Sequence, residues 1–162
     1  MEPKIITLSE KRLVGMRIET SISNFGSPQL WQTFMPRKKE IEDRIEGAYY
    51  SIQVYPTGFQ MKDFTPTTLF EYWAAIEVES EPSPPSKMES FTLPGGTYAV
   101  FIHRGPMSTF QQTLGYIHGQ WLPNSEFELD DRPHFELLGD HYLGPNNPDS
   151  EEEVWVPIKS RP

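Results

Sequence analysis

Glu136 is the residue of this sequence best placed for chemistry, because it stands in the middle of an apolar stretch. His134 to Leu138 reads HFELL, the composition of a buried strand that contains one carboxylate. An unpaired carboxylate is costly to bury, so such a group takes up a proton, gains a partner or faces a cavity. Side chains alternate along a strand, so we expect Phe135 and Leu137 to face a helix layer and Glu136 to face the opposite side. That side is either a cleft with Glu136 as its anionic group, or the open, solvated face of a half-buried sheet.

The other residues with catalytic or metal-binding potential form no recognisable motif. His103, His118, His134 and His141 match no zinc-binding spacing, and the chain has no cysteine. His134 lies two residues before Glu136 on the same strand face, where the two side chains could pair. A GxSxG motif, a phosphate-binding glycine loop and a dinucleotide fingerprint are all missing. We therefore expect no metal, no cofactor and no assignable catalytic residue.

Aromatic residues could surround the carboxylate. Five of them belong to elements that could converge on it: Tyr50, Trp73, Phe101, Tyr116 and Trp155. Any one of these is more typical of core packing. As a set beside one acid, they indicate an aromatic-walled pocket with a single anionic group, which suits an organic cation.

Alternating apolar residues and turn residues predict the strands that must position this pocket. The predicted strands are residues 4–19, 49–55, 69–78, 88–93, 98–103, 134–138 and 154–158. Asp140 to Glu151 is rich in Gly, Pro and Asn and predicts a loop, and we expect Glu151 to Glu153 to be solvated.

Two helices are predicted between these strands. Ser27 and Pro28 are typical of a helix start, and an apolar face runs from Trp31 to Ile45 with a kink or a short first turn at Pro36. The second helix begins at Ser108, which forms a capping box with Gln111. Its apolar face consists of Phe110, Leu114, Ile117 and Trp121.

The same order of elements occurs twice. Val14 aligns with Tyr98, Tyr50 with Phe135 and Phe70 with Val154 at a nearly constant spacing. We expect one domain over residues 1–162, made of two strand–helix–strand–strand repeats at 4–79 and 88–159 with a Ser- and Pro-rich linker at 80–87. The predicted fold class is α+β, with an antiparallel sheet and both helices on one side.

Composition limits the class of partner. The 162 residues carry 14 basic and 23 acidic side chains, a net charge of −9. This balance argues against nucleic acid as a partner and favours cations. No apolar run is long enough for a membrane span, and the N-terminus lacks a signal peptide, so we expect a soluble cytoplasmic protein with no membrane partner. The sequence starts at the first predicted strand, so we expect a stand-alone binder rather than a transcription factor.

Several segments, taken in order, resemble the gyrase-inhibitor-like (GyrI-like) small-molecule-binding domain, which is also the effector-binding module of multidrug-responsive transcription activators. The similar segments are KIITLSEKRLVGMR, LWQTFMPRKKEI, YYSIQVY, GGTYAVFIHRG, PHFELLGDHY and EVWVPI, which together run from about Lys4 to Lys159. The resemblance implies a duplicated fold with two helices flanking a central cleft for hydrophobic, often cationic compounds.

The resemblance also implies site residues and two alternative functions. The strand glutamate deep in the family's cleft corresponds to Glu136, and Trp73, Tyr98 and Trp155 correspond to pocket aromatics by element. Some relatives hydrolyse cyclopropane-bearing toxins with a pocket glutamate and a tyrosine, and the family name suggests a protein that restrains a topoisomerase. We expect a binder of amphipathic small molecules that are cationic or aromatic, with the hydrolase and the topoisomerase inhibitor as the alternatives.

Overall fold

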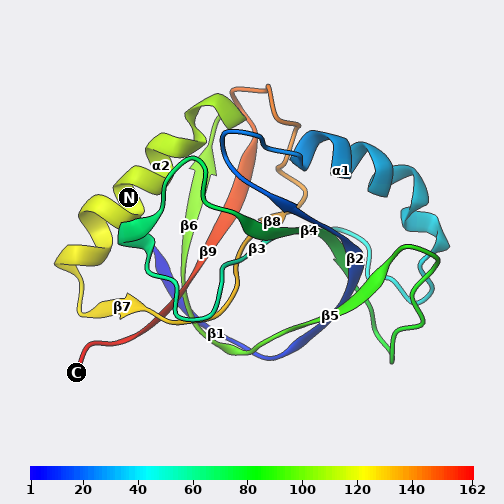
Figure 1. Cartoon of the computed structure of the whole chain (residues 1–162), viewed down its shortest axis with the longest axis horizontal. Helices are drawn as coiled ribbons and strands as arrows, with labels where there is room; N and C mark the ends of the chain where they lie inside the picture. The colour runs from blue at the N-terminus through cyan, green and yellow to red at the C-terminus, as the bar shows by residue number, and fades with distance from the viewer.

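The computed structural model describes residues 1–162 as an α+β fold with one large antiparallel sheet and two short α-helices (Figure 1), which confirms the predicted fold class. The elements are β1 (Lys4–Leu8), β2 (Lys11–Thr20), α1 (Ser27–Phe34), β3 (Tyr49–Val54), β4 (Phe70–Glu77), β5 (Glu89–Leu93), β6 (Gly96–Arg104), α2 (Phe110–Tyr116), β7 (Phe127–Leu129), β8 (His134–Leu138) and β9 (Glu151–Ser160). No helix is long and apolar enough to cross a membrane.

The sheet is continuous across the two halves of the chain. Its strands follow the order β1-β6-β9-β8-β3-β4-β2-β5, and β7 pairs with β9 beside this path. Strands β3 and β8 meet near its centre. Each half also supplies a strand to the edge of the other, because β1 pairs with β6 and β5 pairs with β2. The two halves therefore share one sheet.

One row of paired residues shows which face of the sheet the helices cover. The register joins six residues across the strands: Met16, Ala74, Ser51, Glu136, Val154 and Phe101. Directly paired residues project from the same face. The first two pack in a core cluster with Leu30 and Phe34 of α1, and the last two in a cluster with Ile117 at the end of α2. Both helices thus cover one face, and Glu136 lies on that face between them.

This arrangement corrects the predicted facing of β8. Phe135 lies on the face away from the helices, in a second core cluster that also contains Tyr50, Trp73, Tyr98 and Trp155. The bent ribbons that run from β1 to β2 and from β5 to β6 close this face (Figure 1). The alternation along β8 is as predicted, but the helices lie on the side of Glu136, because curvature of the sheet buries the other side.

The first helix is shorter than its apolar periodicity predicts. α1 ends at Phe34, and Pro36 lies in a 3₁₀ segment, Met35–Glu40, after which Ile41 is extended. Proline cannot donate the backbone hydrogen bond that an α-helix needs at this position. Ser27 is the first residue of the helix rather than its cap, and its hydroxyl donates to the Tyr72 hydroxyl.

The second helix also differs from its predicted start. A 3₁₀ turn, Met107–Thr109, precedes α2, and no side chain caps the helix, so the expected capping box does not form. After Tyr116 the chain continues as a π-helical turn, Ile117–Trp121. The predicted apolar face does pack against the core below β6 and β9.

The two halves have the same order of elements: two strands, a helix and two strands, with β7 added in the second half. The register is symmetric about the Ser51–Glu136 pair, because Tyr50 pairs with Leu137 and Ile52 with Phe135. We propose that residues 4–79 and 88–159 are copies of one unit related by an axis through this pair. In the row of paired residues, Met16 would then correspond to Phe101 and Ala74 to Val154. The sequence alignment instead paired Val14 with Tyr98 and Phe70 with Val154.

Candidate functional site

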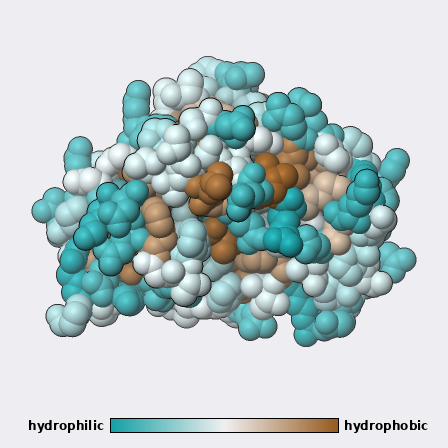
Figure 2. Space-filling view, viewed as in Figure 1, coloured by the Kyte–Doolittle hydropathy of each residue, from teal (hydrophilic) through white to brown (hydrophobic).

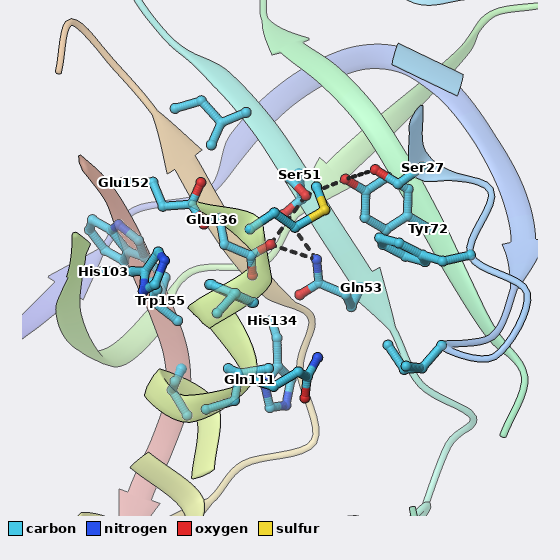
Figure 3. Close-up of a pocket in the computed structure, with 18 of the residues that line it drawn as sticks. Ser27, Ser51, Gln53, Tyr72, His103, Gln111, His134, Glu136, Glu152 and Trp155 are labelled. Atoms are coloured by element: carbon cyan, nitrogen blue, oxygen red, sulfur yellow. Dashed lines mark hydrogen bonds between the residues drawn. The ribbon is translucent and has the colours of Figure 1, made fainter. Parts of the chain in front are cut away.

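A cavity of about 520 Å³ lies between the two helices on the helix-covered face, with Glu136 in its wall (Figure 3). This volume is typical of a pocket for a drug-sized molecule. Strands β3, β4, β8 and β9 supply the floor, and α1, α2 and the neighbouring loops supply the sides. Aromatic residues make up much of the wall: Phe25, Trp31, Tyr55, Phe64, Phe70, Tyr72, Phe110, Tyr142 and Trp155. No Lys or Arg lines the cavity.

The surface in the same region is apolar as well. The space-filling view shows several hydrophobic residues exposed near the middle of the molecule, interspersed with hydrophilic ones (Figure 2). Two residues of the cavity wall, Ile22 and Met107, keep more than a third of their surface exposed. An apolar ligand would therefore remove apolar protein surface from water on binding.

Glu136 is buried and hydrogen-bonded. The residue is 8% exposed. The Ser51 hydroxyl donates to Oε1 of Glu136 at 3.2 Å, and Nε2 of Gln53 donates to the same oxygen at 3.0 Å. Both donors come from β3, which pairs with β8, so the sheet register itself holds the carboxyl group in place.

A directed chain of hydrogen bonds leads to Glu136 from α1. Ser27 and the indole N–H of Trp31 both donate to the Tyr72 hydroxyl, at 3.1 and 2.9 Å. That hydroxyl has one proton left to donate, and Ser51 Oγ lies 2.6 Å away. Ser51 in turn donates to Glu136. In this series of hydrogen bonds each donor is directed towards the carboxylate, and Figure 3 shows the line of side chains.

The protonation of Glu136 depends on burial more than on these donors. Burial raises the pKa of Glu136 to about 8, the nearby Glu152 adds to the rise, and the hydrogen bonds from Gln53 and Ser51 offset part of it. Near neutral pH the free protein thus carries Glu136 largely as the neutral acid, and an added positive charge would favour its ionised form.

Glu152 is a second carboxyl group in the same cavity, and sequence analysis placed it in a solvated segment. It is half-buried on β9, where burial raises its pKa to about 7. No side chain or backbone group of the protein donates a hydrogen bond to it. Figure 3 shows Glu152 on one side of Glu136 and Ser51 and Gln53 on the other. The two-residue alternation of a strand could have indicated this position: Glu152 precedes Val154 by two residues, so the two side chains project from the same face.

Burial favours the neutral form of two histidines that line the cavity, His134 and His118. His134 is 9% exposed, and burial lowers its pKa to about 3. Burial also lowers the pKa of His118, whose Nδ1 is buried without a partner. His103 instead lies within 2.7 Å of the Thr113 hydroxyl through Nδ1. No hydrogen bond joins His134 to Glu136, so the pairing considered from the sequence does not form. No group of three acidic, His or Cys residues could hold a metal ion.

Of the seven proposed ligand-binding residues, Glu136 faces the cavity. Trp155 borders the cavity as part of β9, but its ring stacks on Phe135 in the core of the opposite face, with centroids 5.1 Å apart. Three others lie in the core on the opposite face of the sheet: Tyr50, Trp73 and Tyr98. They alternate with the residues that face the helices, so the strand register turns them away from the cavity.

The remaining two proposed residues lie near α2 but outside the cavity. Phe101 is buried beneath the helix, with its ring centroid 5.2 Å from that of Trp121. Tyr116 donates its hydroxyl hydrogen bond to the backbone carbonyl of Met1 at 2.9 Å. Much of the aromatic wall comes instead from loops and helices, with residues such as Tyr55 and Phe110, and part of it comes from Phe70 and Tyr72 of β4.

The chain is similar to proteins of known type. The model of the GyrI-like small molecule binding domain matches residues 1–159. Transcriptional regulator BrlR of Pseudomonas aeruginosa is 28% identical over 160 residues, which cover 98% of this chain and 56% of the relative. The chain thus spans about half of that regulator's length.

Solved structures share the fold. SAV2435 bound to tetraphenylphosphonium has a TM-score of 0.68 at 18% identity and covers 98% of this chain and 94% of its own. EcmrR in a DNA complex has a TM-score of 0.73 at 13% identity, over 99% of this chain and 58% of its own. Because the family model matches nearly the whole length, the chain belongs to the GyrI-like small molecule binding domain family.

Proposed function

We propose that the cavity binds amphipathic organic cations and that Glu136 is the anionic group that holds them. The observation that carries this proposal is a buried carboxyl group in an aromatic cavity whose lining contains no Lys or Arg. A positive charge is the partner that Glu136 lacks. The similar protein SAV2435 has been solved with tetraphenylphosphonium, a lipophilic cation, which supports this class of ligand.

The strength of such binding has two sources. An ion pair between the ligand and Glu136 forms in a site with little water, where charges interact more strongly than at the surface. The rings of Trp31, Tyr55 and Phe64 line the same space and offer faces and edges to a flat or branched cation. A desolvated cation beside an aromatic ring gains about 2 kcal/mol.

Glu136→Gln tests the proposal because it keeps the shape and the hydrogen-bond acceptor but removes the charge. We expect the affinity for a rhodamine-type dye or tetraphenylphosphonium to fall by about tenfold or more, which corresponds to about 1.4 kcal/mol. A neutral ligand of similar shape should lose much less. Isothermal titration or fluorescence anisotropy measures both.

Glu79→Gln is the matched control, since it removes the same charge from an exposed residue just before the linker. We expect it to leave both affinities unchanged. Equal losses for neutral and charged ligands in Glu136→Gln, or no loss for either, would contradict the proposal. Mass analysis of the ligand after incubation separates a binder from the hydrolase alternative, and we expect the ligand unchanged.

A further inference from the structure

Three carboxyl oxygens in the cavity lack a hydrogen-bond donor from the protein. Both donors to Glu136, Ser51 and Gln53, reach Oε1. Nothing donates to Oε2 of Glu136 or to either oxygen of Glu152. These oxygens face the cavity, so a ligand that fills it and displaces water must itself supply donors or leave them unsatisfied at a free-energy cost.

No surrounding side chain donates to these oxygens in the structure, although Gln111 and Tyr142 also line the cavity. The cavity wall contains no Lys or Arg. His103 already lies within hydrogen-bond distance of Thr113 and of the Pro106 carbonyl. His134 is nine-tenths buried, lines the cavity and has no hydrogen-bond partner in the protein. Oε2 of Glu136, both oxygens of Glu152 and the ring nitrogens of His134 are therefore available for hydrogen bonds to a ligand.

The two carboxyl groups lie close enough to contact one ligand group. Glu136 on β8 pairs with Val154 on β9, so Glu152 is its diagonal neighbour on the same face. Such neighbours have Cα atoms about 7–8 Å apart, and long side chains bridge that distance. Figure 3 shows Glu152 beside Glu136 in the same cavity.

We propose that this cavity selects cations that also donate hydrogen bonds, namely primary ammonium, amidinium or guanidinium groups on an aromatic or aliphatic body, with Glu152 as the second acceptor. This proposal rests on the proposed function and narrows its ligand class. A quaternary cation neutralises the charge of Glu136 but leaves the three oxygens without donors. A group with several N–H bonds supplies the charge and satisfies both carboxylates, and charge-assisted bonds of this kind are about twice as strong as neutral ones.

The test compares two ligands with the same biphenylmethyl body, one ending in a primary ammonium and the other in a trimethylammonium group. Both are titrated at pH 8 into the wild type and into Glu152→Gln. We expect the wild type to bind the primary ammonium at least tenfold more tightly. In Glu152→Gln this preference should fall at least fivefold, while the affinity for the trimethylammonium ligand changes less than threefold.

Glu151→Gln is the matched control, because Glu151 is the preceding residue of β9, projects from the other face and does not line the cavity. It should keep the wild-type preference. If Glu152→Gln does not fold, Glu152→Asp, which keeps the charge but shortens the reach, should still lower the preference. Equal or stronger binding of the trimethylammonium ligand by the wild type, or an unchanged preference in Glu152→Gln, overturns this inference alone. Failure of both cations to bind the wild type overturns the proposed function instead.

Discussion

Glu136 combines two demands that oppose each other. The strand register buries it, and burial favours its neutral form, whereas Ser51 and Gln53 donate to its oxygen and favour the charged form. Behind Ser51 stands the Tyr72 hydroxyl, fixed by Ser27 and Trp31 of α1. The carboxyl group is therefore positioned for ionisation but remains protonated until a positive charge arrives. Binding of a cation should then release a proton.

This proton release predicts the pH dependence of binding. The pKa of Glu136 is about 8 in the free protein, so affinity for a permanently charged cation should rise as the pH increases from 6 to 8 and level off above. The rise should be roughly tenfold or more, because most molecules must first lose a proton at pH 6. Titration of tetraphenylphosphonium across this range measures it.

The other titratable groups around Glu136 determine which controls the pH titration needs. Glu152 on β9, with a pKa of about 7, contributes a weaker rise in the same direction. His134 stays neutral because its pKa is about 3, and burial raises the pKa of Tyr72 above the range of the titration. Glu136→Gln should keep only the weaker rise, and a neutral ligand should show none. Affinity for the cation that falls as the pH rises would contradict the mechanism.

At the scale of elements, local signals in the sequence predicted most strands well, but they did not predict which face of a strand the helices cover. The bounds of β8 match the prediction residue for residue, because apolar residues and turn signals mark both ends. The face of Glu136 was predicted wrongly, since both faces of β8 are covered and the sequence does not show that distant strands curve over Phe135. Strand β7 was missed because it has only three residues, Phe127–Leu129.

Strand β2 depends on a glycine at its closest approach to β4. An added Cβ at Gly15 would lie 2.1 Å from the Ala74 carbonyl oxygen and 2.7 Å from the Ala75 Cβ. These are backbone and short side-chain atoms, so the strands would have to separate. We expect Gly15→Ala to lower the free energy of unfolding by about 2 kcal/mol or more. Urea denaturation followed by circular dichroism measures this.

Gly119→Ala provides the comparison, because a Cβ there meets nothing within 4 Å and the residue lies in the helical turn Ile117–Trp121. Alanine favours helical backbone over glycine by up to about 1 kcal/mol. We expect Gly119→Ala to be neutral or stabilising. Equal stability of the two variants would show that the contact between β2 and β4 tolerates a side chain.

At the scale of the whole molecule, the cavity exists because the two halves meet. Ser51 and Gln53 come from the first half, and Glu136 and Glu152 come from the second. The repeated order of elements was visible in the sequence, and the apolar stretch HFELL marked the strand with the key carboxyl group. The wall of the cavity was not visible, because residues such as Tyr55 and Tyr142 lie in loops whose positions depend on the complete fold.

The exchange of edge strands predicts how the chain behaves when it is cut. Strand β1 of the first half pairs only with β6, and β5 of the second half pairs only with β2, while β3 and β8 join the two centres. Each half alone would expose these strand edges and the buried faces of Leu13 and Tyr98 to water. Linker residues such as Ser83 and Pro84 are exposed. A break at this position therefore removes no core contact.

We expect residues 1–83 and 84–162, prepared separately, to be largely unfolded, and an equimolar mixture to recover the sheet and the binding of lipophilic cations. Far-ultraviolet circular dichroism follows the sheet, and titration of tetraphenylphosphonium follows the cavity. Cleavage of the intact chain between Ser83 and Pro84 should leave both signals in place, which controls for the break itself. Edge pairing and the shared core supply the driving force for reassembly, as a large apolar surface is removed from water when the halves meet. Independent folding of either fragment would show that its own strands suffice without the partner half. Recovery of the sheet without cation binding would mean that the cavity requires the covalent link as well.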